Sequence, residues 1–198
     1  MKSLHAFAAA TVSLAALLAA ANTSAAPAAA RWTPVAMADP MVGGAAMSPM
    51  ADIVTNASKS ADHTTLVAAV KAAGLVETLQ GPGPFTVFAP TNEAFGLLPD
   101  GTVDSLVQPD MKPTLTKILT YHVVPGRLLA ADIARVARAN HGVATLTTVE
   151  GGKLMLRDAG HGRWEITDEK GGKAWITIAD VRQSNGVVHV IDHVLMPN

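Results

Sequence analysis

The spacing of the apolar residues changes part-way along this chain, and that change constrains the fold more than any other feature. Before His141 apolar residues recur every three or four positions, as in residues 62–74, which predicts amphipathic helices. Beyond His141 they alternate with polar residues around Gly151-Gly152 and again around Gly171-Gly172, which predicts antiparallel hairpins. Helices in the first half followed by antiparallel strands in the second indicate the α+β class.

A strand is predicted to run directly into a helix at the sequence GPFTVFAPTNEAF, residues 83–95. The run from Phe85 to Phe88 favours a strand, and Pro90 stops it because proline donates no hydrogen bond to a sheet. Thr91 follows as a helix N-cap, and Glu93 falls in the first turn, where the helix dipole favours an acid.

Charge and cysteine content exclude several classes of function. The net charge of −1 gives no basic surface for nucleic acid, so no nucleic-acid partner is expected. The chain has no cysteine, which excludes disulfides and thiolate metal sites. Hydrophobic residues make up 49% of the chain and aromatic ones only 4%, so we expect a mainly aliphatic core.

The first residues have the order of a secretory signal peptide: a positive charge at Lys2, an apolar stretch and a small-residue exit. We expect residues 1–26 to be this leader, with cleavage after Ala21, Ala25 or Ala26; an uncleaved anchor is the alternative. Residues 27–47, rich in Ala, Pro and Met, are predicted to be a flexible linker, and residues 48–197 the single domain. The mature protein is expected to be secreted or periplasmic, with no membrane span.

Three stretches together resemble the signatures of the fasciclin (FAS1) family. They are TVFAPTNEAF at residues 86–95, TYHVVPG at residues 120–126 and SNGVVHVIDHVLMP at residues 184–197. The resemblance implies a twisted β-sandwich or wedge with helices packed along one side. It also implies that Thr91 and Asn92 fix the strand-to-helix corner through side-chain hydrogen bonds to backbone.

The same resemblance implies where a partner would bind. Fasciclin domains are extracellular adhesion modules whose partners are proteins, or sometimes carbohydrates, of a cell surface or matrix. Animal members use an Asp-Ile pair, matched here by Asp180 and Val181, and a Tyr-His segment, matched by Tyr121 and His122. These four residues are the candidate partner-binding site, although the flanking Ile178, Ala179 and Arg182 depart from the family motif.

Metal binding is the first chemical alternative. His122, His189, His193 and Asp192 have suitable side chains, but on one strand His189 and His193 share a face that Asp192 does not. The competing interpretation makes His122 and His189 core groups with satisfied hydrogen bonds. A loose group of thioethers that could suit Cu(I) is formed by Met37, Met41, Met47 and Met50. No metal or other cofactor is expected.

Catalysis is not expected either. The chain lacks a nucleophile elbow, a P-loop, a dinucleotide fingerprint and a zinc-protease motif. Asp168 and Glu169 precede Gly171-Gly172, where solvated turn charges are predicted. Asn56-Ala57-Ser58 is a glycosylation sequon, relevant only to a eukaryotic secretory route.

The sequence therefore predicts a non-catalytic adhesion or surface-interaction module. The alternative is a carrier of a small hydrophobic ligand, held in an apolar pocket between helices and sheet. The sequence does not decide the identity of the partner or the oligomeric state.

Overall fold

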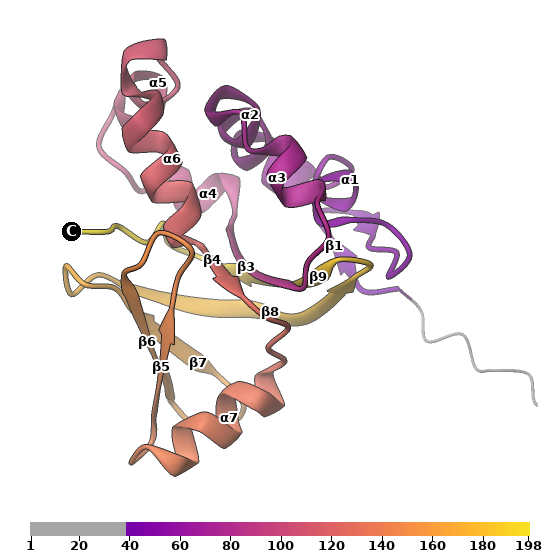
Figure 1. The fold of residues 1–198 in the computed structure, drawn as a ribbon, viewed down its shortest axis with the longest axis vertical. Coiled ribbons are helices and arrows are strands. Elements are labelled where there is room, and N and C mark those ends of the chain that lie inside the picture. The colour runs from indigo at the N-terminus through magenta and orange to yellow at the C-terminus, as the bar shows by residue number, and fades with distance from the viewer. Residues whose placement is uncertain (1–38) are drawn as a thin grey trace, which may run out of the picture. The chain divides into compact units, whose positions relative to one another are not determined.

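A seven-stranded sheet forms the centre of the fold in the computed structural model, which describes residues 39–198 (Figure 1). The strand order is β4-β3-β9-β8-β7-β6-β5, and every neighbouring pair is antiparallel except β3 and β9. The strands are β3 (Phe85–Pro90), β4 (Val123–Pro125), β5 (Val143–Thr147), β6 (Lys153–Asp158), β7 (Trp164–Thr167), β8 (Lys173–Gln183) and β9 (Gly186–Ile191).

Helices of the first half of the chain pack on β3, β4 and β9, as Figure 1 shows. They are α1 (Ile53–Ala57), α2 (Thr64–Ala73), α3 (Val76–Gln80), α4 (Asn92–Gly96), α5 (Thr102–Leu106) and α6 (Lys112–Tyr121). Two short 3₁₀ turns, Ala61–His63 and Pro109–Met111, precede α2 and α6. The remaining helix, α7 (Ala130–Ala139), packs instead against β5 and β6. The α+β class and the fasciclin-like wedge are thereby confirmed.

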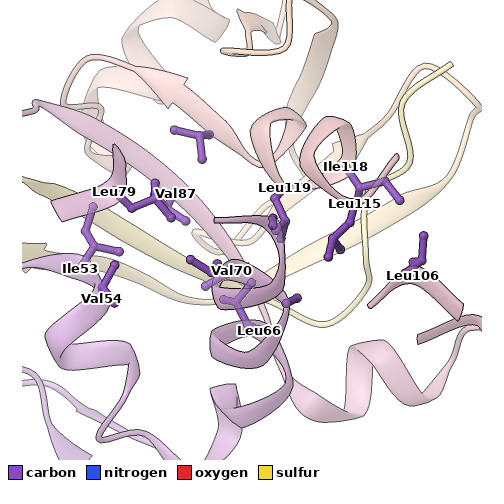
Figure 2. Close-up of a cluster of buried hydrophobic side chains, with 14 of the residues drawn as sticks. Ile53, Val54, Leu66, Val70, Leu79, Val87, Leu106, Leu115, Ile118 and Leu119 are labelled. Atoms are coloured by element: carbon purple, nitrogen blue, oxygen red, sulfur yellow. The ribbon is translucent and has the colours of Figure 1, made fainter. Parts of the chain in front are cut away.

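Two large apolar cores hold these layers together. One lies between the helices and β3 and is shown in Figure 2; its labelled side chains include Ile53, Leu66, Val87 and Leu119. The other joins α7 to β5–β7 and β9, and its members such as Leu154 and Ile166 are fully buried. Because burial of each large aliphatic side chain contributes about 1.5–3 kcal/mol, these cores supply the stability that disulfides cannot.

The strand-to-helix corner has the predicted structure. The Thr91 hydroxyl oxygen accepts a hydrogen bond from the Ala94 N–H at 3.2 Å, capping α4. Asn92 accepts from the Thr65 N–H at 3.0 Å and donates to the Ala61 carbonyl at 2.8 Å. The corner is therefore fixed by side-chain hydrogen bonds to the backbone, which also attach α4 to the start of α2.

A short hairpin replaces the last part of the expected linker. β1 (Met41–Val42) pairs with β2 (Ala45–Ala46), and Val42 and Met47 are each 3% exposed. They pack on Val181 and Val190, forming a third, small core on β8 and β9. Ordered packing thus begins before Ser48, because this hairpin covers apolar side chains that would otherwise face solvent.

Candidate functional site

Tyr121 is fully buried at the end of α6 and connects two hairpin turns. Its hydroxyl donates to the Lys153 carbonyl at 2.8 Å and accepts from the Glu169 N–H at 3.0 Å. A Cβ at Gly152 would lie 2.7 Å from Cε2 of the tyrosine ring, so only glycine fits there. Burial raises the pKa of Tyr121 to about 12. Tyr121 therefore links the turn that precedes β6 to the turn that precedes β8.

His122 is buried beside Tyr121 and binds the last segment of the chain. Its Nδ1 lies 2.8 Å from the Ile118 carbonyl, and its Nε2 lies 3.0 Å from the Leu195 N–H. The carbonyl can only accept and the amide can only donate, so Nδ1 carries the proton and the ring is neutral. Burial lowers the pKa of His122 to about 4, although Asp168 opposes the shift. His122 therefore attaches α6 to the segment that follows β9.

Asp180 lies on an irregularity of β8, between the paired residues Ile178 and Val181. Its φ angle is 59°, in the left-handed region that a non-glycine residue rarely occupies. Its Oδ1 accepts from the N–H of Ala130, the first residue of α7, at 2.7 Å, and it is half-buried. Asp180 thus caps α7, whereas Val181 is 1% exposed and lies in the core beneath the hairpin.

His189 completes this arrangement from β9. Its Nδ1 accepts from the Asp180 N–H at 3.3 Å, and its Nε2 lies 2.9 Å from the Leu128 carbonyl. Burial lowers the pKa of His189, so the neutral ring donates from Nε2 and accepts at Nδ1. The interpretation of His122 and His189 as satisfied core groups is confirmed.

The proposed histidine cluster for metal binding does not assemble. β9 ends at Ile191, so His193 is not on the strand with His189 and is instead exposed. His193 Nδ1 lies 2.8 Å from Asp192 Oδ1, which also accepts from the Trp175 N–H at 2.7 Å. Among residues 39–198, no three His, Asp or Glu side chains form a group that could hold a metal ion.

The four candidate residues are therefore not a single exposed patch. Tyr121, His122 and Val181 are buried, and of the four only Asp180 has part of its surface in solvent. Next to it on β8, Ala179 and Arg182 are exposed. We define Ala179, Asp180 and Arg182 as the bulge surface.

The sequence did not indicate that two polar residues, Asp168 and Asn56, are buried. Asp168, expected to be a solvated turn charge, is 3% exposed. Its carboxylate accepts from the N–H groups of Gly172 at 2.6 Å, Lys170 at 3.0 Å and Met196 at 2.9 Å. The sequence feature that could have indicated this role of Asp168 is its position four residues before the second glycine of a hairpin turn. Asn56 is also buried, 1% exposed, and donates to Ser48 O at 2.7 Å, so the folded chain hides this sequon.

Residues 61–197 match the family model of the Fasciclin domain. The chain belongs to the fasciclin family. Protein sll1483 of the cyanobacterium Synechocystis sp. is 47% identical over 158 residues, which cover 79% of each chain. The immunogenic protein MPB70 of Mycobacterium bovis is 35% identical over 150 residues, 73% of this chain and 68% of MPB70.

Longer relatives carry this domain as one part. Transforming growth factor-beta-induced protein ig-h3 of Sus scrofa is 38% identical over 136 residues, which span 67% of this chain and 17% of ig-h3. Among solved structures, a FAS1 domain pair from the insect cell adhesion molecule Fasciclin I has a TM-score of 0.65 at 20% identity. That match covers 74% of this fasciclin chain and 51% of the insect one, and it shows the shared fold.

Residues 1–38, which hold the expected leader, Met37 and most of the expected linker, lie outside the described residues. Within residues 39–198, no helix has the length and apolar character needed to cross a bilayer.

Proposed function

We propose that this fasciclin chain is a non-catalytic surface-interaction module that acts outside the cytoplasm, with the bulge surface as its contact. The observation that carries the proposal is the position of Asp180. It is the one candidate residue that reaches solvent. Two hydrogen bonds fix its position, because its carboxylate accepts from the Ala130 N–H of α7 and its own N–H donates to Nδ1 of His189. A segment whose conformation is already fixed costs little ordering entropy when a partner binds.

In this proposal the buried candidate residues maintain the fold and do not contact the partner. Tyr121 and His122 hold the hairpin turns and the last segment, and Val181 anchors β8 beneath the bulge. The partner is a protein or carbohydrate of a cell surface or matrix. This assignment is supported by the structural similarity to part of an insect cell adhesion molecule.

The test measures binding of the purified full-length chain to intact cells, and to a cell-envelope fraction, of the organism that encodes it. Ala179→Arg and Arg182→Glu change exposed side chains without removing a hydrogen bond within residues 39–198. We expect saturable binding that each variant weakens by roughly tenfold, the effect of losing about 1.4 kcal/mol at a contact.

The matched control is Arg157→Glu, a similar charge reversal at an exposed position of β6. It should bind as the wild type does. Asp180→Asn removes the charge at the centre of the bulge surface and should weaken binding without unfolding the domain, because asparagine tolerates the left-handed conformation and keeps an oxygen for the Ala130 N–H. Equal binding by all variants would reject the bulge surface, and absence of saturable binding would reject the proposed function.

A further inference from the structure

An open cleft of about 480 Å³ lies at the end of the sheet where β3 begins and β8 turns into β9. Three separate segments form its walls: residues 82–84 before β3, Arg127 after β4, and residues 184–185 between β8 and β9. Clefts that bind small molecules typically measure ~300–1,000 Å³, so this one has room for a ring and its substituents.

Hydrogen bonds to the rest of the fold hold the walls of this cleft in place. The side-chain amide of Asn185 donates to the Leu79 carbonyl at 2.7 Å, and its side-chain oxygen accepts from the Ile53 N–H at 3.1 Å. The Gly126 N–H donates to the Pro84 carbonyl at 2.9 Å and so joins the segment after β4 to the one before β3. Because the cleft is formed in advance, little ordering entropy is lost when a ligand binds.

Arg127 is the charged group of the cleft. Its side chain is exposed, and its only hydrogen bond within residues 39–198 is a long one of 3.4 Å from Nη2 to the Ser184 carbonyl. It forms no ion pair with an Asp or Glu of the same residues, and the lining holds no carboxylate. A planar guanidinium can donate two parallel hydrogen bonds to a carboxylate. The cleft is therefore suited to an anionic group.

The cleft adjoins the bulge surface. Residues 127–130 lie along β8, because Arg127 bonds to the Ser184 carbonyl and the Ala130 N–H bonds to Asp180. Between these two contacts, Arg182 and Ser184 are both exposed while the residue that separates them is buried, so they share one face. A ligand in the cleft can therefore extend along the bulge surface, past a second positive charge.

The walls favour a carbohydrate over an extended peptide. Pro82 and Pro84 have no N–H, and the Ser184 N–H is already donated to the Ala51 carbonyl at 2.9 Å. Few backbone donors remain to pair with a peptide strand. The exposed Ser184 hydroxyl makes no hydrogen bond within residues 39–198, so it can bond to a sugar hydroxyl. The exposed proline rings add apolar surface on which a sugar ring can lie.

We propose that this cleft binds a uronic acid residue of an acidic polysaccharide. The sugar carboxylate pairs with Arg127, and a ring hydroxyl bonds to Ser184. The next sugars run along the bulge surface past Arg182 to Asp180, whose Oδ2 accepts from a sugar hydroxyl. This proposal rests on the proposed function for its location outside the cytoplasm, and it narrows the partner to a negatively charged carbohydrate.

Isothermal titration calorimetry of the purified full-length chain tests the class of ligand. The probes are tetragalacturonate and tetramannuronate, each compared with its methyl ester, which keeps the sugars but removes the charge. We expect saturable binding of at least one acid, and roughly tenfold weaker binding of its ester, the effect of losing about 1.4 kcal/mol at a charge-assisted contact. Failure of both acids to bind, or equal binding of acid and ester, would overturn the proposal. Hexaglutamate binding as tightly as the sugar acids would overturn the choice of a carbohydrate.

Substitutions locate the binding. Arg127→Gln removes the positive charge and, within residues 39–198, only the long bond to Ser184, and it should weaken binding of the acid roughly tenfold. Ser184→Ala should weaken it roughly fivefold, the effect of one neutral hydrogen bond. Arg157→Gln, at an exposed position of β6, is the matched control and should bind as the wild type does. Unchanged affinity in Arg127→Gln would contradict the proposed position.

The two tests fail in different ways. If neither acid binds the purified chain but binding to cells still depends on Arg182, the bulge surface is a contact and the cleft does not bind a uronic acid. If the acids bind through Arg127 but the chain does not bind cells or the cell envelope, the cleft is correct and the proposed function is wrong.

Discussion

The ring of Phe88 stacks on the imidazole of His189, with ring centroids 5.6 Å apart and planes inclined by 25°. Phe88 also donates its backbone N–H to the His122 carbonyl at 2.9 Å. Each of these residues belongs to a different one of the three sequence signatures. The signatures therefore meet at one phenylalanine inside the domain, and their shared role is to join the helical half to the strands.

We expect His189→Phe to destabilise the fold, although a phenyl ring can still lie beside Phe88. The Leu128 carbonyl and the Asp180 N–H would lose their partners. Unsatisfied buried groups cost about 1–3 kcal/mol each, so the free energy of unfolding should fall by about 2–6 kcal/mol in urea denaturation. His193→Phe, at an exposed position, should change it by less than about 1 kcal/mol. Equal effects of the two substitutions would contradict this role of His189.

Stability should fall as the pH is lowered from about 6.5 toward about 4. Unfolded histidines take up protons near 6.5, but buried His122 remains neutral until about 4, so the unfolded state binds more protons in this window. His63 and His189, whose pKa values burial also lowers, act in the same direction. His122 alone accounts for about 3 kcal/mol at most.

Urea denaturation at about pH 7.5 and about pH 5 checks this prediction. His122→Asn should be less stable at the higher pH and should depend less on pH. His161→Asn, an exchange at an exposed position, should keep the wild-type dependence. A wild-type stability that stays level across the window would show that these histidines are not buried and neutral.

Tyr121 is the only tyrosine of the chain, so its ionisation can be followed directly by phenolate absorbance. In the folded protein it should ionise near pH 12, because burial raises its pKa, and near its ordinary value of 10 once urea has unfolded the chain. Since the raised pKa favours the neutral phenol, stability is lost as the pH rises above about 10. Ionisation near 10 in the folded state would place the ring in solvent.

Gly43→Ala should loosen the hairpin that covers Val181, and Gly44→Ala should not. Both glycines have positive φ angles, 57° and 75°, so the strain on the backbone is comparable. A Cβ at Gly43 would lie 2.4 Å from the Ser60 hydroxyl oxygen, whereas nothing lies within 4 Å of one at Gly44. Amide hydrogen exchange should therefore quicken at Val42 only in Gly43→Ala. Similar exchange in both variants would show that the hairpin is not held closely against Ser60.

The sequence predicted the order of helices and strands because period and turn chemistry are local properties. It did not predict the β1–β2 hairpin, because two-residue strands are too short to show a period. The central signature is divided between two elements, because Tyr121 ends α6, His122 caps it and β4 begins at Val123. A local pattern does not locate such a boundary to the residue.

The sequence named four candidate residues but did not show which of them are exposed. Asp180 adopts a positive φ because it must reach both the Ala130 N–H and His189, and these contacts are long-range. Asp168 is buried because the Met196 N–H, far along the chain, donates to it. No local pattern carries that information, since each contact depends on how separate segments pack.

The proposed function depends most on the bulge surface being the part of the chain that contacts a partner. Site-specific photo-crosslinking tests this directly, with the photoreactive residue at position 179 or, as a control, at position 157 of β6. On intact cells of the source organism, we predict a discrete crosslinked product from position 179 and none from position 157. Products from both positions, or from position 157 alone, would contradict the account.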